Sequence, residues 1–430
     1  MIRRDAGLEC ALLALCLLVF AGTRPFEAGD IQAVSSDSRG ALFEALLYLA
    51  TTGSCILLAV PRLRPALPGP ALVGVILLVV SCCVSLGWSD AVAQALPRCA
   101  QFVAVTGAVF CACAVLPPRR VLALVAAALA VTILADLAAI ALVDAATHQQ
   151  IDLTEDLTGA WKGLHIHKNY AGAVAGLGVL VFAIRSTRGF GAVDLVLALL
   201  SLLLLVGSAS KTAMLVTALT FLALTVVKSL ASLLGPSPVR WIAAYGLIAA
   251  ALLSPFVAEP AAAFLADGRA LTGRVELWNV MLAYAAEHPL SGAGFASFWR
   301  VGEASPILAL TRGWGIRAGQ GHNGYLDLLV TVGIPGLALA ATVFVVAPLV
   351  QLAVKLRDRS LDYDLCFCLV VFSLLHNLTE SSLLSGNHPV YVALVVGVAV
   401  LRQLGSARAV SAASRLVGRL QAPLPRRGYA

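Results

Sequence analysis

Charged residues are scarce in this chain. Asp, Glu, Lys and Arg make up 12% of its 430 residues, whereas hydrophobic residues make up 60%. So few charges could not cover a water-soluble domain of this length, and long apolar runs recur from one end of the sequence to the other. Because a charged group is costly at the centre of a bilayer, this composition is typical of helical proteins that cross a membrane several times.

Signals for several kinds of site are also lacking. All ten cysteines lie in apolar runs, so we expect them to pack rather than to bind a metal, and residues two apart on a helix cannot face one ion. No carboxylate pair or His/Asp cluster has convincing metal-ligand spacing. The glycines of segment 292–295 follow no strand, which disfavours a nucleotide loop. The net charge of +7 is spread over short loops and a tail. We therefore expect no metal, no cofactor and no nucleic-acid partner.

The apolar runs predict an all-α polytopic membrane protein with about 12 transmembrane helices of about 20 residues each. Lys and Arg concentrate in alternate loops, and the positive-inside rule then places both termini in the cytoplasm (N-in/C-in). The first run lacks a convincing small-residue cleavage site, so we expect it to be a retained helix. The expected spans begin near Leu8, Ala41, Pro70, Cys99, Val121, Tyr170, Phe190, Thr212, Trp241, Ile334, Asp364 and Pro389.

No repeat of fixed period is visible, and one membrane domain is expected over residues 1–405. Segment 259–321 forms a large extracytoplasmic loop in this topology, and residues 406–430 form a basic cytoplasmic tail that lies on the membrane surface or is disordered. Asp136 and Asp194 are isolated acidic residues within otherwise apolar spans.

Polar chemistry concentrates in and after the large loop. Residues 273–286 predict an amphipathic helix with Leu282 on its apolar face, and the His288-Pro289 pair ends it. A second helix is expected to begin at His322, and Gly333 with Pro335 predicts a bend in it. All seven histidines fall near the extracytoplasmic face in the predicted topology, which places the titratable chemistry on that side.

Five short motifs in this order resemble the O-antigen ligase and Wzy-type polysaccharide polymerase superfamily, and within it most closely the exopolysaccharide polymerases of the ExoQ kind. Together they cover roughly residues 150–390, on one face of the predicted membrane domain. The motifs are Trp161-Lys-Gly-Leu-His-Ile-His-Lys-Asn169, Ser210-Lys-Thr-Ala213, Gly273-Arg-Val-Glu-Leu-Trp278, His288-Pro-Leu-Ser-Gly-Ala-Gly-Phe-Ala-Ser-Phe-Trp299 and His322-Asn-Gly-Tyr-Leu-Asp327.

The resemblance implies a GT-C-like glycosyltransferase of the bacterial inner (cytoplasmic) membrane with its active site facing the periplasm. Such an enzyme takes an undecaprenyl-diphosphate-linked oligosaccharide as donor and a glycan as acceptor, within membrane lipid and without a metal or nucleotide sugar. A flippase and a chain-length regulator are the partners expected of a polymerase. Many ligases have Arg where this chain has Lys211, and a Lys is a point donor where an Arg is a planar fork.

The chemistry of glycosyl transfer from a diphosphate assigns roles to the polar residues. Anionic oxygens must be stabilised and a hydroxyl must be activated. We expect Arg274 to clamp the diphosphate, unless it pairs with Glu276 or Glu287 instead. His322 is the expected general base, because the ordinary pKa of histidine, about 6.5, lies near ambient pH. The further substrate-binding candidates are Lys211, Lys168, Arg269, Asn323, Tyr325 and Glu380, of which Glu380 is equally expected to pair with a nearby cation.

Three functions stay open at this stage. The first is a polymerase that joins lipid-linked repeat units, and the second is a ligase that moves a finished glycan to lipid A core or to protein. The third is a transporter of a polyprenyl-linked sugar. A transporter predicts ionisable residues in the middle of its spans and often inverted repeats. The extracytoplasmic polar cluster favours transfer chemistry over transport.

Overall fold

A computed structural model describes residues 2–26, 38–63, 70–149, 157–235, 274–311 and 318–420. Within these ranges the chain is helical, and its one element of β pairing is an isolated bridge between Thr147 and Trp161. The all-α class predicted from the sequence is therefore confirmed for the part of the chain that the structure describes.

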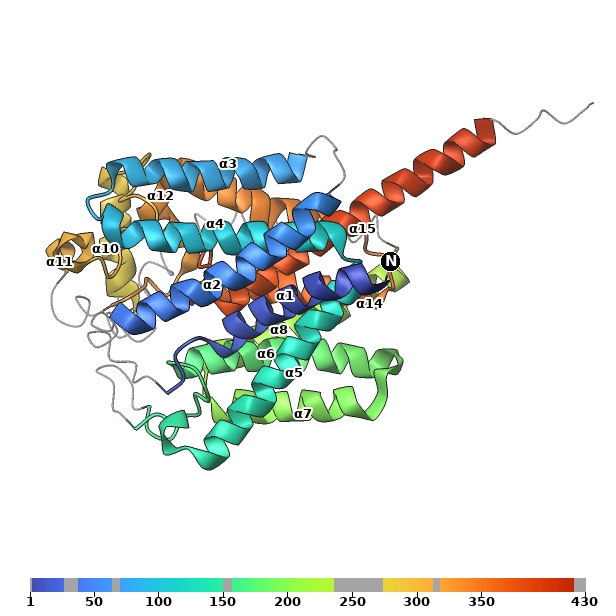
Figure 1. The fold of residues 1–430 in the computed structure, drawn as a ribbon, viewed down its shortest axis with the longest axis horizontal. Helices are drawn as coiled ribbons and strands as arrows, with labels where there is room; N and C mark the ends of the chain where they lie inside the picture. Colours follow the sequence, from blue (N-terminus) through green and yellow to red (C-terminus); the bar gives the residue numbers. More distant parts are fainter. Residues whose placement is uncertain are drawn as a thin grey trace, which may run out of the picture.

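The first part of the chain, up to residue 235, forms eight α-helices among the residues that the structure describes (Figure 1). Proline opens α3 and α5, where a missing N–H costs nothing because the first helical N–H groups have no intrahelical acceptor. A π-helical turn at Ser186–Phe190 joins α6 to α7. The helices are α1 (Ile2–Ala21), α2 (Ser38–Ala59), α3 (Pro70–Ser85), α4 (Val92–Val115), α5 (Pro118–Leu142), α6 (Lys168–Arg185), α7 (Gly191–Gly207) and α8 (Lys211–Leu233).

The second half begins with two helices at one end of the bundle, α10 (Arg274–Glu287) and the short α11 (Pro306–Leu310). Long helices then return along the bundle. They are α12 (Gly324–Ala341), which a π-helical turn at Thr342–Val346 continues into α13 (Ala347–Val354), followed by α14 (Leu361–His376) and α15 (Pro389–Leu420). Because α15 continues to Leu420, the boundary expected at residue 405 does not coincide with the end of a helix.

Helix α6 lies at the centre of the bundle, in contact with α5, α7, α8 and α14. Small residues on α6 allow its backbone to approach these neighbouring helices closely. A Cβ on Gly172 would lie 2.6 Å from the Cβ of Ser210, and one on Gly176 would lie 2.5 Å from the Oγ1 of Thr217. Small residues at helix contacts let two backbones approach closely within a membrane. The approach of α6 to α8 brings the N-terminal residues of the two helices together.

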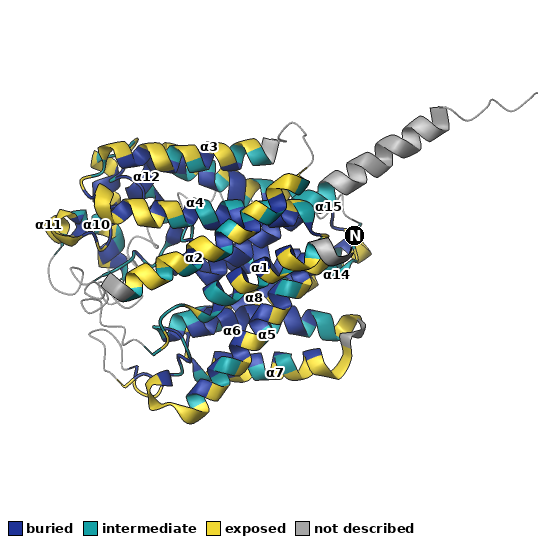
Figure 2. Cartoon of the chain, in the orientation of Figure 1, coloured by how far each residue is buried: buried dark blue, intermediate teal, exposed yellow. Residues whose placement is uncertain are grey.

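The outer helices expose apolar faces, which Figure 2 shows as exposed residues along α2, α3 and α7. Leu57 on α2 is 75% exposed and Val193 on α7 is 71% exposed. Continuous apolar surface of this kind is unfavourable in water but matches the hydrocarbon of a bilayer. The surface of the bundle therefore fits a multi-pass membrane protein.

Six of the described helical segments are long and apolar enough to cross a membrane, namely Gly40–Arg62, Val92–Val115, Pro118–Leu142, Lys168–Arg188, Lys211–Leu233 and Gly324–Val354. Three shorter apolar helices accompany them, Leu72–Trp88, Gly191–Gly207 and Pro389–Gly405. The span expected to begin near Trp241 lies outside the described residues, so the count of 12 stays a prediction.

Basic loops from distant parts of the sequence meet at one end of the bundle. Lys228 lies 2.6 Å from one oxygen of Asp364, and Arg188 lies 2.6 Å from the other. Arg120 lies 3.8 Å from Glu9 near the N-terminus. These residues end α8 and α6 or begin α14 and α5, so the opposite ends of the same helices carry Lys168, Lys211 and His376. The basic residues of these loops therefore lie at the end of the bundle opposite His376, and the membrane topology stays a prediction.

The two acidic residues expected to be isolated within spans have partners, so that expectation was wrong. Asp194 accepts a hydrogen bond from Arg185 at 3.0 Å. Asp136 lies 3.2 Å from His165 and accepts a hydrogen bond from the backbone N–H of Leu164 at 2.9 Å. Both carboxylates lie towards helix ends, where a loop or the end of a neighbouring helix supplies the partner.

The expected bend in α12 is confirmed at Gly333, whose φ of 66° is not helical. A Cβ there would lie 2.5 Å from the backbone of Leu290, and the N–H of Ile334 donates to the carbonyl of Pro289 at 2.8 Å. Only glycine suits a position that combines positive φ with such a close backbone approach. The loop that follows α10 therefore packs directly against the bend in α12 and is held there by this hydrogen bond.

Candidate active site

Glu380 is the centre of a buried polar cluster at the end of the bundle opposite the basic loops. Its side chain is 4% exposed and accepts hydrogen bonds from three donors: Asn169 Nδ2 at 3.0 Å, Arg274 Nη2 at 3.0 Å and His322 Nδ1 at 3.1 Å. Burial by itself raises the pKa of this carboxyl. The hydrogen bond from His322 and the charges of His322, Arg274 and His376 outweigh it and lower the pKa to about 2. Glu380 is therefore ionised at neutral pH.

His322 is oriented by its backbone as well as by Glu380. It precedes α12 with a φ of 50°, and Asn323 is the N-cap of that helix. The expectation that His322 itself begins the helix was therefore wrong by two residues. The turn before it is held by Trp278, which donates to the Gly321 carbonyl at 2.7 Å, and by Asp327, which accepts from the Gly321 N–H at 3.0 Å.

Glycine is required on both sides of His322. A Cβ on Gly321 would lie 2.5 Å from Met281 Cε, and a Cβ on Gly324 would lie 2.2 Å from Asn377 Oδ1. Asn377 is itself fixed, because its side chain donates to Ser373 and Ser382 and accepts from the N–H groups of Ser382 and Leu383. His322 thus projects from a turn that is packed on both flanks, and its side chain is 28% exposed.

Arg274 is the first residue of α10 and reaches the segment between α14 and α15. One Nη group donates to Glu380 and the other to the carbonyl of Thr379. The alternative partners considered from the sequence, Glu276 and Glu287, are therefore not the ones that the fold selects. Helix α10 itself matches the predicted amphipathic helix closely, although Leu282 is 48% exposed rather than buried, contrary to expectation.

The segment after α14 is joined to the start of α12 by backbone hydrogen bonds. The N–H of Gly324 donates to the carbonyls of Asn377 and Glu380, and the N–H of Asn323 donates to Ser381 Oγ at 3.1 Å. These contacts set the separation between Glu380 and His322, two residues that lie far apart in the sequence.

Of the other residues predicted to bind substrate, Lys211 and Lys168 begin two helices at this end of the bundle. Lys211 begins α8 beside Ser210, which donates to Asn169 Oδ1 at 3.2 Å. Lys168 begins α6, is 5% exposed, and donates its backbone N–H to His148 Nε2. Arg269 lies outside the described residues.

Asn323 and Tyr325 make contacts within the protein. Asn323 Oδ1 accepts from the N–H groups of Tyr325 and Leu326 and so caps α12. Tyr325 donates its hydroxyl to the carbonyl of Leu374 at 3.0 Å. Both side chains therefore hold α12 in place, and contact with substrate stays a prediction for each.

Sequence reasoning missed two polar residues at this end. Asn169 ends the first of the five motifs, but its contact with Glu380 depends on the packing of α6. Arg300 has a φ of 53°, and its guanidinium lies so close to Gly319 that a Cβ there would be 1.9 Å from Nε. Arg98 holds this turn by donating to the carbonyls of Ala296, Trp299 and Arg300.

Arg300 is unusual among the cations here. Burial lowers its pKa, and the nearby Tyr170 opposes that change. Its guanidinium has no hydrogen bond or ion pair among the residues that the structure describes. A cation without a carboxylate beside the glycine loop that leads to His322 is a feature that residue spacing alone gave no reason to single out.

Within the part of the chain that the structure describes, no three His, Cys, Asp or Glu side chains are gathered as a metal would need. Several histidines make ring contacts with one another or with a tyrosine. His148 and His167 meet edge to face at 5.1 Å, and Tyr170 lies 4.6 Å from His388. All ten cysteines are free thiols.

A family model described as O-antigen ligase matches residues 196–341, about a third of the chain. The match includes Arg274 and His322 and stops before Glu380. It confirms over these residues the resemblance to the O-antigen ligase and polysaccharide polymerase superfamily, whereas the closer likeness to the ExoQ kind stays a prediction. No curated protein matches the chain.

Proposed function

We propose that this chain, which carries an O-antigen ligase family segment at residues 196–341, transfers an undecaprenyl-diphosphate-linked oligosaccharide to a sugar hydroxyl. The reaction takes place at the periplasmic face of the bacterial inner membrane, in a polytopic N-in/C-in protein of about 12 helices with a GT-C-like architecture. The observation that carries the proposal is the contact of His322 Nδ1 with the ionised Glu380, which Arg274 also binds.

This contact prepares His322 to act as a general base. When Nδ1–H donates to Glu380, the lone pair of the imidazole is on Nε2. The acceptor hydroxyl gives its proton to Nε2 while its oxygen bonds to C1 of the donor sugar. The bond between C1 and the phosphate oxygen breaks, and undecaprenyl diphosphate leaves with the bonding electrons. A base positioned in this way typically contributes about 10²- to 10⁴-fold in rate.

Cations compensate the charge that develops on the leaving diphosphate. The two Nη groups of Arg274 are already engaged with Glu380 and Thr379, so Arg274 serves both to fix Glu380 and to add positive charge. Lys168 and Lys211 supply further point charges, and Arg269 supplies a further guanidinium. Arg300 adds a planar fork, which suits two phosphate oxygens better than an ammonium group does.

Within this function we propose a polymerase of the ExoQ type, working with a flippase and a chain-length regulator. A ligase acting on lipid A core or protein is the second candidate, and the description of the matching family model favours it. Transport receives less support, because Asp136 and Asp194 pair with His165 and Arg185 towards helix ends rather than in the middle of a span.

The experiment is transfer by the purified chain from an undecaprenyl-diphosphate-linked repeat unit in excess chelator. We expect turnover without added metal, because cationic side chains provide the charge compensation. A requirement for added magnesium or manganese would contradict the metal-independent mechanism. A ladder of multiples of the repeat supports a polymerase, as does a deletion strain that accumulates single lipid-linked repeats. Accumulation of unattached long chains supports a ligase.

A further inference from the structure

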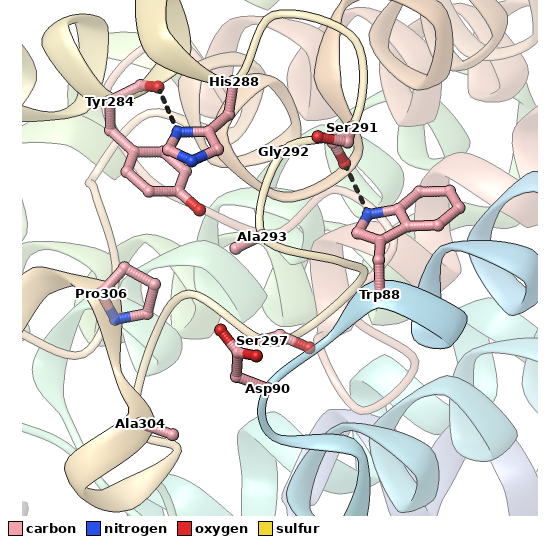
Figure 3. A pocket seen from close by; sticks show the side chains of 10 residues that line it. All are labelled: Trp88, Asp90, Tyr284, His288, Ser291, Gly292, Ala293, Ser297, Ala304 and Pro306. Carbon is pink, nitrogen blue, oxygen red and sulfur yellow. Dashed lines mark hydrogen bonds between the residues drawn. The ribbon is translucent and has the colours of Figure 1, made fainter.

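A cavity lies at the same end of the bundle as His322, between the α3–α4 connection and the loop that follows α10. Its volume is about 260 Å³, near the lower limit of small-molecule sites, which is ~300 Å³. Figure 3 shows its walls, with Trp88 and Asp90 on one side and, on the other, Tyr284 from α10 and His288 directly after that helix. The cavity is half open to the surroundings, so a ligand could enter it from outside the bundle.

The aromatic walls are fixed in place. Trp88 donates its indole N–H to the Ser291 carbonyl at 3.1 Å, and its ring is 47% exposed. The ring of Tyr284 stacks on His288 at 4.3 Å and meets Phe298 edge to face at 5.0 Å. A rigid aromatic face binds an apolar surface at little cost in conformational entropy.

Two polar groups that line the cavity lack partners. The Asp90 carboxylate and the Tyr284 hydroxyl make no hydrogen bond to any residue in the described ranges, whereas Ser297 already donates to Phe295 and accepts from Ser89. Burial, and then the charge of Asp90, raises the pKa of Tyr284, so its hydroxyl stays protonated and able to donate. The cavity therefore offers an acceptor carboxylate and a donor hydroxyl between aromatic faces.

We propose that this cavity binds one sugar ring of the saccharide, remote from the bond that is transferred, and that it selects neutral or amino sugars over uronic acids. A sugar presents C–H faces that stack on aromatic rings and hydroxyls that pair with a carboxylate and a phenol. The unpaired Asp90 repels a second carboxylate. This inference rests on the proposed function, because it assumes that a saccharide is held at this end of the bundle.

The position of the cavity suits a sugar beyond the reacting one. Tyr284 lies ten residues after Arg274 on α10, which corresponds to about 15 Å along the helix at ~1.5 Å per residue. The loop that forms the cavity floor is also tied to α12, because the N–H of Ala293 donates to the carbonyl of Val330 at 2.9 Å. Helices α10 and α12 therefore connect the two sites rigidly, and a saccharide of a few rings would span them.

The binding test uses the purified full chain with methyl glucoside, methyl glucosaminide and methyl glucuronide, followed by the fluorescence of Trp88. We expect the first two to bind at least about fivefold more tightly than the glucuronide, from the repulsion of two nearby carboxylates. Asp90→Asn should remove this preference. Glu303→Gln is the matched control, an exposed carboxylate in the segment after α10 that does not line the cavity. Trp88→Phe identifies the signal that comes from the cavity.

Equal affinity for the glucuronide, or an unchanged preference in Asp90→Asn, would overturn the inference. So would a full fluorescence signal in Trp88→Phe, which would leave Trp88 as a membrane-interface anchor.

Kinetics provide the second readout. Asp90→Asn should raise KM about tenfold for a donor with the complete repeat unit, because one hydrogen bond to a charged group is lost. The rise in KM should be much smaller for a donor with one sugar, which does not reach the cavity. If the parent protein binds glycosides with the Asp90-dependent preference but transfers nothing, the proposed function fails and the saccharide site stands.

Discussion

Replacing Glu380 by Gln should disable the protein at two levels, activity and stability. The change preserves the size of the side chain and removes its charge. Glu380 accepts from Asn169, Arg274 and His322, whereas a glutamine has one acceptor oxygen and an amide that only donates. The three donors cannot all keep an acceptor. At least one of them would be left facing another N–H group in a buried cluster.

The cost follows from burial. The side chain of Glu380 is 4% exposed and that of Arg274 is 19% exposed. Little water can therefore solvate the Arg274 guanidinium once the carboxylate is removed. Breaking a buried ion pair by removal of one partner typically costs ~3–5 kcal/mol, and we expect about 3 kcal/mol here because Arg274 keeps its contact with Thr379. Turnover should fall by about 10²- to 10⁴-fold, because an amide that donates towards Nδ1 favours the wrong tautomer of His322.

The pH dependence gives this prediction a second check. Because the pKa of Glu380 in the folded protein is about 2, below its ordinary value, the stabilisation is fully present above that ordinary value. It is lost only as the pH falls towards 2. The difference in apparent melting temperature between parent and Glu380→Gln should therefore not shrink as the pH falls from 8 to 5. Glu303→Gln, which removes an exposed carboxylate, should change neither stability nor turnover.

The assay combines turnover on a lipid-linked donor with thermal unfolding in detergent, for both variants. A Glu380→Gln protein with parental turnover would refute the idea that the carboxylate orients His322. A stability difference that shrinks steadily between pH 8 and pH 5 would refute the lowered pKa.

The other predictions concern the remaining parts of the site and its orientation. Arg274→Lys should lose at least about tenfold in turnover at unchanged membrane abundance, since an ammonium cannot reach Thr379 and Glu380 together; full activity would contradict this role. Gly324→Ala should cost about 1–3 kcal/mol of stability and displace His322, whereas Gly107→Ala, where a Cβ meets nothing within 4 Å, should not; equal melting temperatures would count against the packed turn. Single cysteines in a background without native cysteines should test the topology with an impermeant reagent, and reaction of either inner site would reverse it. The exposed positions expected outside are Gln149 and Glu303, and those expected inside are Arg120 and Arg357.

Local pattern was enough to predict helix α10 and the bend in α12. The three- and four-residue spacing that placed a helix at 273–286 is a property of neighbouring residues, and α10 follows it within one residue at each end. The bend at Gly333 was predictable for the same reason, because glycine and proline act on their own backbone. Leu282 was assigned to the wrong face because α10 packs mainly against α12, and the width of the buried face depends on that neighbour.

The site itself could be predicted only in part. Arg274, His322 and Glu380 were each singled out by residue type, yet the pairing of Arg274 with Glu380 rather than Glu276 depends on how α10 meets the segment after α14. Asp136 shows the same limit, since its partner His165 comes from a loop on another part of the chain. Arg300 gave no signal, because an arginine in a glycine-rich loop is ordinary until the fold places it over Gly319.

The most direct test of the central claim is the turnover of His322→Ala and His322→Gln on a lipid-linked repeat unit from pH 5 to pH 9. If His322 takes the acceptor proton, His322→Ala should lose about 10²- to 10⁴-fold in turnover with donor binding largely retained, and His322→Gln should be no better. A glutamine can donate a hydrogen bond to the diphosphate but cannot take up the proton. Near-parental turnover of His322→Gln with an unchanged pH profile would contradict the general-base role and leave His322 as a binding residue.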